Sequence, residues 1–421
     1  MNVINRKISI GAAVALIIVS IALTVSVTMV VAMRQFNYKL RNVNQRQAMF
    51  DYITEVDNAI RRNYVGEISE EELRTALAKG YLNGIGDPYA EYLTAAEYRT
   101  ETERLAGSCT GLGLEIAEQA DNSVIITAVH KNSAADKAGV QKGDVITALD
   151  GGETDYAAVA RRLASGEKTM ITVKRGEESI AFELSASTYT ATTVESRLIN
   201  TTGYIRIRSF YSNTPEQFKA AVTTLEEQGA QNFVFDLRNN EGGTLAAATD
   251  ILSYLLPRGT YARRVETAGA VSDLTSDGTH EFAHSSVTLV NETTAGEAEL
   301  FTGVLQEFKK TTVVGMSTRG RGKIQAFYNV TSDGSAIKVS IASLSLLEGG
   351  EIEGKGIAPD QAVALTADQE SRFEFLTEED DPQLKAALSA LNNTIVTPPT
   401  TSTAETTGSA ASTTTSAQPA S

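Results

Sequence analysis

Residues 233–243 read FVFDLRNNEGG, and this stretch decides the fold class. Its first five residues, 233–237, are mostly apolar and have the length of a buried β-strand, and the Gly-Gly pair that closes the stretch predicts a turn. A second apolar run, residues 287–290, leads into a helix expected over residues 297–308. Strands alternating with helices predict an α/β fold with a largely parallel sheet, whose sites lie just beyond the carboxyl ends of the strands. We therefore expect residues 238–243 and 291–299 to form the site.

The pattern of apolar residues changes twice in the part of the chain that precedes this region. Residues 45–105 carry apolar side chains at spacings of three and four, which predicts a helical segment. Residues 106–187 read as short strands with two short helices, and residues 188–392 carry the strand and helix alternation of the α/β domain. The fold class expected is an α/β core preceded by an inserted β-rich domain and a helical segment.

The β-rich segment resembles a PDZ domain. The stretch NSAADKAGVQKGDVITALDGG, residues 132–152, carries most of the resemblance, and a Gly-rich loop precedes a strand as in that family. The resemblance implies that backbone N–H groups of this loop bind the terminal carboxylate of a peptide, while the adjacent strand edge takes the peptide by β-augmentation. The loop residues are Gly111, Leu112, Gly113 and Leu114. Taken alone, the Gly-x-Gly pattern also suits an ordinary tight turn.

The two ends of the chain differ from the body in composition. Residues 8–33 form a run of 26 residues without a charge, and about 20 apolar residues suffice to cross a bilayer. We interpret this run as an uncleaved transmembrane anchor, with residues 1–7 cytoplasmic and the body extracytoplasmic, hence a single-pass protein of the cell membrane. Residues 393–421 are rich in Thr, Ser, Ala and Pro, which predicts a disordered tail.

Composition excludes several classes of function. The chain of 421 residues has 37 Lys and Arg against 52 Asp and Glu, and a net charge of −15 leaves no basic surplus for nucleic acid. A single Cys excludes disulfide frameworks and multi-cysteine metal sites. The sequence predicts no metal and no cofactor.

One motif argues for zinc, but its context does not. His280 and His284 fit the pattern H-E-x-x-H, which requires a helix to bring both rings to one ion. A turn precedes the motif and a strand follows it, and on a strand the two side chains stand about 13 Å apart. A zinc peptidase through His280 and His284 is therefore only a remote alternative.

From about residue 45 to 392 the chain resembles the carboxyl-terminal processing peptidases, or tail-specific proteases, which are serine peptidases that carry a PDZ domain. Residues 233–243 resemble the family's D-L-R-x-N-P-G-G turn, and residues 289–306 resemble its nucleophile segment. Residues 313–325 resemble its lysine segment, and GKGIAPD at 354–360 continues the pattern in register.

The resemblance places the two catalytic positions on residues without the required chemistry. The nucleophile position falls on Gly296 and the general-base position on Arg321, with Gln325 retained as the residue that orients the base. Glycine has no attacking atom, and Arg stays protonated because its pKa exceeds about 12. Gly242 and Gly243 are retained as donors resembling an oxyanion hole. With the base gone, Gln325 is expected to have nothing to orient.

Neighbouring residues offer a substitute dyad. Thr294 lies two residues before Gly296, and Lys323 lies two residues after Arg321. An active serine-type peptidase that uses Thr294 and Lys323 is thus the alternative to an inactive one.

These features predict a membrane-anchored pseudo-peptidase that binds without cleaving. The expected partners are C-terminal peptides of exported or membrane proteins, the membrane itself through residues 8–33 and, as an option, a second copy of the chain. No nucleic acid is expected. A scaffold in which only the PDZ-like domain works is a further alternative.

Overall fold

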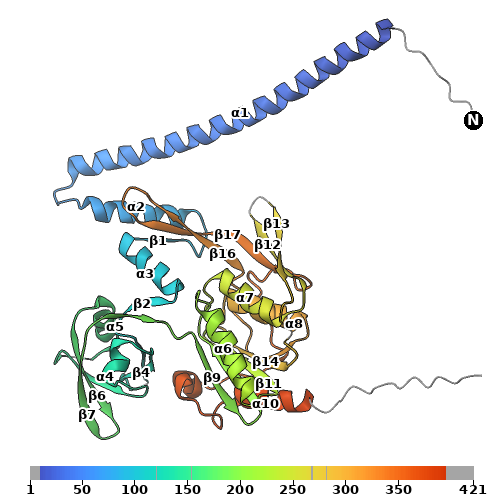
Figure 1. Cartoon of the computed structure of the whole chain (residues 1–421). Helices are drawn as coiled ribbons and strands as arrows, with labels where there is room; N and C mark the ends of the chain where they lie inside the picture. Colours follow the sequence, from blue (N-terminus) through green and yellow to red (C-terminus); the bar gives the residue numbers. More distant parts are fainter. Residues whose placement is uncertain (1–9, 120, 153, 267–268, 281, 395–421) are drawn as a thin grey trace, which may run out of the picture. The chain divides into compact units, whose positions relative to one another are not determined.

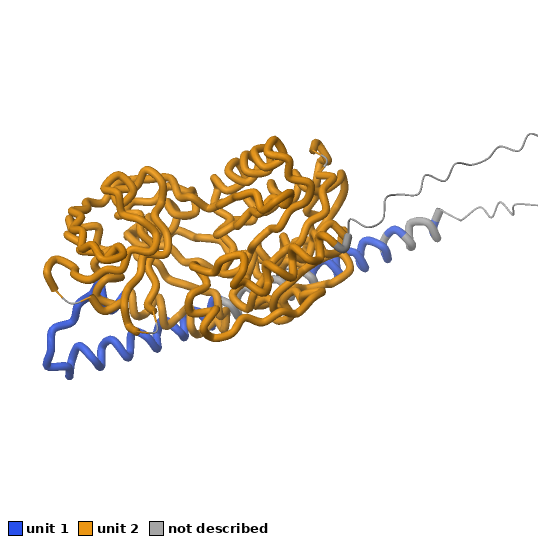
Figure 2. Tube along the Cα trace, turned by 90° about the horizontal axis from the view of Figure 1, so that it is seen from below, with its two compact units in different colours: residues 1–74 blue, residues 75–421 orange. Residues whose placement is uncertain are grey.

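The computed structural model describes residues 10–394 apart from 120, 153, 267–268 and 281. The chain divides into two compact units, residues 1–74 and residues 75–421, which Figure 2 shows in different colours. The predicted cytoplasmic tail and all but the first two residues of the predicted C-terminal tail lie outside the described residues.

The first unit is dominated by one continuous helix, α1 (Ile10–Asn63), which includes two segments that were predicted as separate elements (Figure 1). Near its end Arg61 forms ion pairs with Asp57 at 2.8 Å and with Glu70 at 2.6 Å, at the start of α2 (Glu70–Gly84). Across the described residues, no helix combines the length and the apolar character needed to cross a bilayer. The transmembrane helix expected at residues 8–33 is therefore not confirmed.

The second unit contains the predicted β-rich domain. Its five-stranded antiparallel sheet has the order β3-β4-β5-β6-β7, so that β3 is an edge strand. The strands are β3 (Leu114–Glu118), β4 (Val124–Val129), β5 (Val145–Leu149), β6 (Thr169–Arg175) and β7 (Glu178–Leu184). The helices are α4 (Ala134–Ala138) and α5 (Tyr156–Ser165), and α5 contacts β3. A separate ribbon of β2 (Ser108–Gly111) and β8 (Ser187–Thr190) joins the entry and exit of the domain.

A six-stranded sheet forms the α/β domain, as the alternation of strands and helices predicted. Its order is β18-β15-β14-β11-β10-β9, and every pairing is parallel except β10 with β9. The strands are β9 (Val194–Ile199), β10 (Thr202–Ile207), β11 (Asn232–Asp236), β14 (Ser285–Val290), β15 (Thr311–Gly315) and β18 (Gln361–Ala362). The helices are α6 (Thr214–Glu227), α7 (Leu245–Leu255), α8 (Glu297–Glu307) and α10 (Pro382–Thr394), and α10 includes the first two residues of the predicted tail.

Strand β11 shows why this sheet is covered on both faces. Successive side chains of a strand point to opposite faces. Phe233 and Phe235 pack into the core beneath α6, α7 and α8, whereas Val234 packs into a second core with α10. All three are fully buried, and burying one such side chain contributes about 1.5–3 kcal/mol. An uninterrupted apolar strand is the sequence signature of a sheet with two covered faces.

A second sheet was not predicted. It is antiparallel, with the order β1-β17-β12-β13, and β16 pairs with β17 as well. Its strands are β1 (Glu91–Leu93), β12 (Gly259–Glu266), β13 (Val271–Ser276), β16 (Lys323–Asn329) and β17 (Ala336–Leu346). The remaining elements are α3 (Ala95–Leu105), α9 (Ala367–Ser371) and a short 3-10 helix, η1 (Phe373–Phe375).

Candidate functional site

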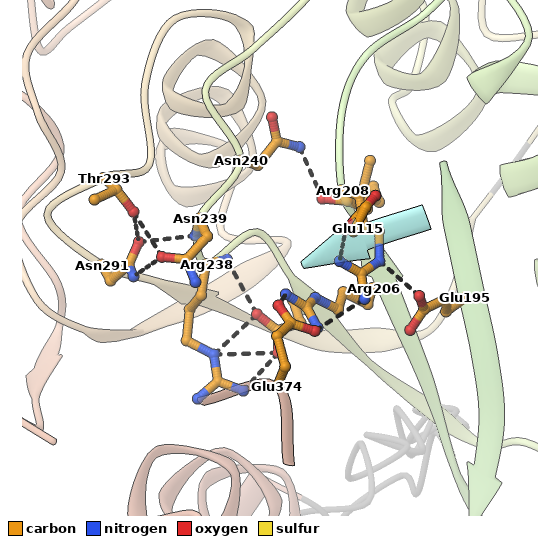
Figure 3. Close-up of polar contacts among 12 residues, drawn as sticks. Glu115, Glu195, Arg206, Arg208, Arg238, Asn239, Asn240, Asn291, Thr293 and Glu374 are labelled. Carbon is orange, nitrogen blue, oxygen red and sulfur yellow. Dashed lines mark hydrogen bonds and ion pairs between the residues drawn. The ribbon is translucent and has the colours of Figure 1, made fainter. Parts of the chain in front are cut away.

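Two turns at the carboxyl ends of adjacent parallel strands form the base of the site. Strand β11 leads into one turn and β14 into the other, and the two are joined by side chains (Figure 3). Asn291 donates through Nδ2 to Asn239 Oδ1 at 2.7 Å, and Asn239 N–H donates to Asn291 Oδ1 at 3.0 Å. Thr293 also donates to Asn239 Oδ1, at 2.8 Å. The two turns expected to make the site therefore form one hydrogen-bonded unit.

Gly296 lies between the second turn and α8. Its φ of 62° and ψ of −122° place it in a sharp connection from strand to helix, the kind of turn that exposes the nucleophile in α/β-hydrolases. A Cβ built at this position would meet only Glu241 O at 3.5 Å and Gly242 Cα at 3.8 Å. The backbone and the space would accommodate a small side chain, although the left-handed φ strains any residue other than glycine.

A buried carboxylate joins this turn to the segment that carries Arg321. Glu299 Oε2 accepts the N–H of Gly296 at 3.0 Å and the N–H of Arg321 at 2.7 Å. Its other oxygen accepts the N–H of Gly320 at 2.6 Å and the hydroxyl of Thr318 at 2.5 Å. One side chain thus brings together two segments that are well separated in sequence.

Gln325 does have a partner, contrary to the expectation that it has nothing to orient. Its Oε1 accepts from Arg321 Nη2 at 2.5 Å, and its Nε2 donates to the carbonyl of Tyr89 at 2.8 Å. The Arg321 guanidinium also lies 5.3 Å from the centre of the Tyr89 ring. The longer guanidinium reaches Gln325 directly, so the amide orients arginine instead of lysine.

Glu297 lies in the segment expected to form the site, but no role was predicted for its side chain. Its Oε2 accepts the N–H of Gly243 at 2.8 Å. Burial raises the pKa of the Glu297 carboxyl, against the opposing effects of the Gly243 N–H, its own N–H and the charges of Arg321 and Lys338. The available signal was an acidic residue in the first turn of a helix, where the dipole favours negative charge.

Both glycine donors of the first turn therefore have acceptors within the chain. The N–H of Gly243 donates to Glu297, and the N–H of Gly242 donates to Asn240 Oδ1 at 2.8 Å. A Cβ built on Gly242 would lie 2.4 Å from Glu297 Oε2, which shows how closely the carboxylate fills this corner.

These groups line a cavity of about 530 Å³. Its walls come from both turns, from the segment around Arg321 and from strands β16 and β17 of the antiparallel sheet. The residues discussed above that line it are Asn239, Gly242, Gly243, Gly296, Glu297, Arg321, Lys323 and Gln325. The structure thus brings together the positions that the sequence resemblance assigned to nucleophile, base and oxyanion donors.

The chain matches Peptidase family S41 over residues 201–363 and a PDZ domain over residues 125–175. It is 32% identical over 336 residues to the carboxyl-terminal-processing protease of Synechocystis sp., with 77% of this chain and 78% of that protein covered. It is 30% identical over 356 residues to a probable CtpA-like serine protease of Staphylococcus aureus, with 82% and 71% covered. The chain belongs to the carboxyl-terminal processing peptidases.

A solved structure supports the fold of this family. The putative S41 protease of Bacteroides fragilis superposes with a TM-score of 0.56, at 17% identity, over 80% of this chain and 97% of that one. The combination of an S41 peptidase fold with a PDZ domain is therefore established for this chain.

The substitute dyad is not assembled in this carboxyl-terminal processing peptidase fold. The buried hydroxyl of Thr294 donates to the carbonyl of Leu237 at 2.9 Å and accepts the N–H of Asn291 at 3.0 Å. Lys323 Nζ donates to Ser343 Oγ at 2.9 Å. Thr294 therefore stabilises its turn, and the structure does not bring the two side chains together.

The two histidines of the H-E-x-x-H motif also have separate partners. His280 Nδ1 lies 2.9 Å from the carbonyl of Tyr254, and its ring stacks on the Tyr254 ring. His284 Nε2 lies 2.9 Å from Glu226. Neither residue is in a helix, and the described residues contain no cluster of three or more His, Cys, Asp or Glu side chains suited to a metal ion.

The PDZ loop keeps two donors without internal partners. The N–H groups of Leu112 and Gly113, both buried, donate to no acceptor among the residues the structure describes, while their carbonyls accept from Ala135 and His130. Buried N–H groups normally have a partner, so these two suit an external ligand. The left-handed φ of 79° at Gly113, where a Cβ would lie 2.1 Å from Ser133 Cβ, requires glycine.

An arginine–glutamate cluster connects the PDZ edge strand to the cavity (Figure 3). Arg208, which lines the cavity, lies 3.3 Å from Glu115 of β3, 2.6 Å from Glu195 and 2.9 Å from Glu374. Glu374 also pairs with Arg206 at 2.5 Å. Burial alone would raise the pKa of Glu374, but Arg206 and Arg208 lower it to about 2.

Proposed function

We propose that this protein is a pseudo-peptidase, which binds protein C-termini through its PDZ domain and does not cleave them. The observation that carries the proposal is Gly296, which has the backbone geometry of an exposed nucleophile position but no side chain. A serine peptidase needs an oxygen at this position and a base that can accept its proton. A guanidinium is a poor proton acceptor in proteins, and that of Arg321 donates to Gln325, so this position supplies no base.

The PDZ domain supports the binding half of the proposal. Strand β3 has β4 as its one strand neighbour among the described residues, so its outer edge suits pairing with an extended peptide, and α5 contacts β3. The N–H groups of Leu112 and Gly113 precede β3 and suit a terminal carboxylate. We propose that the residues Gly111, Leu112, Gly113 and Leu114 hold the C-terminus of an exported or membrane protein.

The alternative is an active peptidase, favoured by the names of the relatives, which are proteases. The test is hydrolysis of quenched peptides with free hydrophobic C-termini by the full chain in detergent. Wild type runs beside Thr294→Ala, Lys323→Ala and a Gly296→Ser/Glu297→Ala/Arg321→Lys variant, which restores the family residues and removes Glu297. We expect saturable binding without turnover by wild type, and turnover by the restored variant alone. Cleavage by wild type that Thr294→Ala or Lys323→Ala abolishes would establish the alternative.

We also propose that residues 8–33 attach the chain to the cell membrane with the body outside. The support is the uncharged run of 26 residues, preceded by Arg6 and Lys7. Proteinase K added to intact cells should degrade the body of this protein. A cytoplasmic control protein in the same cells should stay intact. Full protection of the body would contradict this orientation, and release of the chain by carbonate would contradict the anchor.

A further inference from the structure

The charge of the cavity is opposite to that of the whole chain. The chain carries a net charge of −15, yet cations outnumber carboxylates around the cavity. The cations are Arg104, Arg208, Arg321, Lys323 and Lys338, and the carboxylates are Glu101, Glu241 and Glu297. An excess of one sign of charge around a concave site raises the local concentration of ligands of the other sign.

Three of these cations already have carboxylate partners. Arg104 pairs with Glu101 at 2.8 Å, and Lys338 lies 3.8 Å from the same glutamate. Arg208 belongs to the cluster with Glu374 described above. These three are compensated within the protein and have little charge left for a ligand.

Arg321 and Lys323 differ from the other three. The hydrogen-bond acceptors of their side chains are neutral, Gln325 Oε1 and Ser343 Oγ, and within the described chain no carboxylate lies within 4.0 Å of either cation. The charge of Lys323 also acts on Asp87. The carboxylate of Asp87, however, already accepts hydrogen bonds from Ser340 and from the N–H of Tyr89. Two neighbouring cations in the cavity are thus free to pair with an anion.

The cavity already holds one carboxylate in a position fixed by backbone donors. Glu297 Oε2 accepts the N–H of Gly243 at the start of α8, a helix of 11 residues. Its charge interacts with both Arg321 and Lys338. The shape and polarity of this corner therefore accept a carboxylate, and Glu297 is an internal occupant of it.

We propose that the cavity is a second peptide site, which binds a carboxylate through Arg321 and Lys323, with Glu297 as its internal competitor. It rests on the proposed function in one respect, that the cleft binds and does not cleave. The carboxylate has two sources in peptides, the α-carboxylate of a chain end and the side chain of an acidic residue. This site is separate from the PDZ loop, which offers backbone N–H groups and no free cation.

The absence of Trp in the chain allows a direct test. Phe327, a half-buried residue of β16, lines the cavity, so Phe327→Trp in the full chain gives a single indole there. Indole fluorescence is titrated with a hexapeptide that has a free C-terminus and no acidic residue, and with its C-terminal amide. An amidated hexapeptide with one internal Glu, and the same peptide with Gln, test the second source.

We expect a saturable change in indole fluorescence with at least one carboxylate peptide and no change with the neutral amide. Arg321→Met/Lys323→Met should weaken binding at least about tenfold, since two charge-assisted bonds are lost. Arg321→Lys/Lys323→Arg should retain it, which separates charge from folding, and Lys385→Met on the exposed face of α10 is the matched control. Glu297→Gln should tighten binding by about threefold to tenfold.

Two results would overturn the proposal: the same response to the neutral amide as to both carboxylate peptides, or unchanged affinity in Arg321→Met/Lys323→Met. Calorimetry with the free-terminus peptide separates this failure from failure of the proposed function. If wild type and the double variant both bind one peptide and the Phe327→Trp protein gives no indole response, PDZ binding is intact and there is no second site. No binding at all removes both.

Discussion

The PDZ loop and the peptidase cleft of this chain both present pairs of backbone N–H groups, and they differ in what those groups bind. In the loop, the N–H groups of Leu112 and Gly113 have no acceptor among the described residues. In the cleft, Gly243 donates to Glu297 and Gly242 donates to Asn240. An unpaired buried donor is costly and persists where a ligand supplies the acceptor. The two loop donors therefore have no acceptor among the described residues, whereas the Gly243 donor of the cleft already has a carboxylate.

The largest effect that we predict concerns the Glu297 carboxylate of the cleft and the rate of peptide hydrolysis. Starting from Gly296→Ser/Arg321→Lys, the further change Glu297→Ala should raise the rate of peptide hydrolysis by about 10²–10³, because it frees the Gly243 N–H for a developing oxyanion. Single-turnover hydrolysis of a quenched peptide measures the difference. Glu241→Ala, at an exposed residue that pairs with Arg319 across 3.5 Å, is the control for loss of a nearby charge. Equal rates with and without Glu297 would show that its carboxylate does not occupy the oxyanion position.

The sequence predicted the frame of this cleft and missed its occupant. Mostly apolar strands such as 233–237 predict a sheet with two covered faces, so the parallel sheet and the turns beyond it followed from pattern alone. The direction of the Glu297 side chain depends on the N–H of Gly243, which is distant in sequence and reaches it only through the parallel pairing of β11 with β14. No periodicity in the sequence predicts the contact between Glu297 and Gly243.

The antiparallel sheet escaped prediction for a related reason. Strand β17 pairs with β1, whose residues precede it by more than the length of the PDZ domain, and β12 and β13 have mostly exposed or half-buried side chains. Their partners are set by the tertiary fold and not by an apolar run. Likewise, the contact of Arg321 with Gln325 depends on the reach of a guanidinium, which the loss of a lysine did not suggest.

The next effect concerns the ion pairs that join the two regions. Arg206 and Arg208 lower the pKa of Glu374 from its usual 4.5 to about 2. A carboxyl with a lowered folded-state pKa stabilises the protein above its unfolded pKa and loses that contribution as the pH falls towards the folded value. Stability attributable to Glu374, about 2–3 kcal/mol, should therefore disappear between about pH 4.5 and pH 2.

Urea unfolding of wild type and Glu374→Gln at about pH 7, 4.5 and 3 measures this contribution as the difference between the two proteins. The difference should be largest at neutral pH and shrink on acidification. Glu378→Gln, which removes an exposed partner of Arg197 across 3.4 Å, should stay within about 0.5 kcal/mol of wild type. A difference that is constant with pH would mean that Glu374 titrates normally and that the two regions are not joined by its charge.

A smaller effect tests whether the N–H donors of the PDZ loop bind the peptide. Gly113→Ala places a Cβ 2.1 Å from that of Ser133 at a φ of 79°, so the loop must move and its donors lose their alignment. Affinity for a free-terminus peptide should fall about tenfold. Gly176→Ala, with a φ of 62° and no atom within 4 Å of the new Cβ, carries the backbone strain without the collision. It should bind as wild type does; equal losses in both variants would assign the effect to general destabilisation of the domain.

The smallest effect decides whether Thr294 stabilises its turn or acts as a nucleophile. Its hydroxyl accepts the N–H of Asn291 and lies within hydrogen-bond distance of Leu237 O and Asn291 Oδ1, so Thr294→Ala removes these contacts from a buried turn. We expect a loss of about 1 kcal/mol in the free energy of unfolding, recovered by Thr294→Ser, which keeps the hydroxyl. Carboxylate binding in the cleft should change little in either variant. A nucleophile would behave differently: Thr294→Ala would leave stability nearly intact and abolish turnover. Urea unfolding and hydrolysis measured on the same samples separate these two roles, because the buried Thr294 hydroxyl bonds groups of its own turn and Lys323 bonds Ser343 instead.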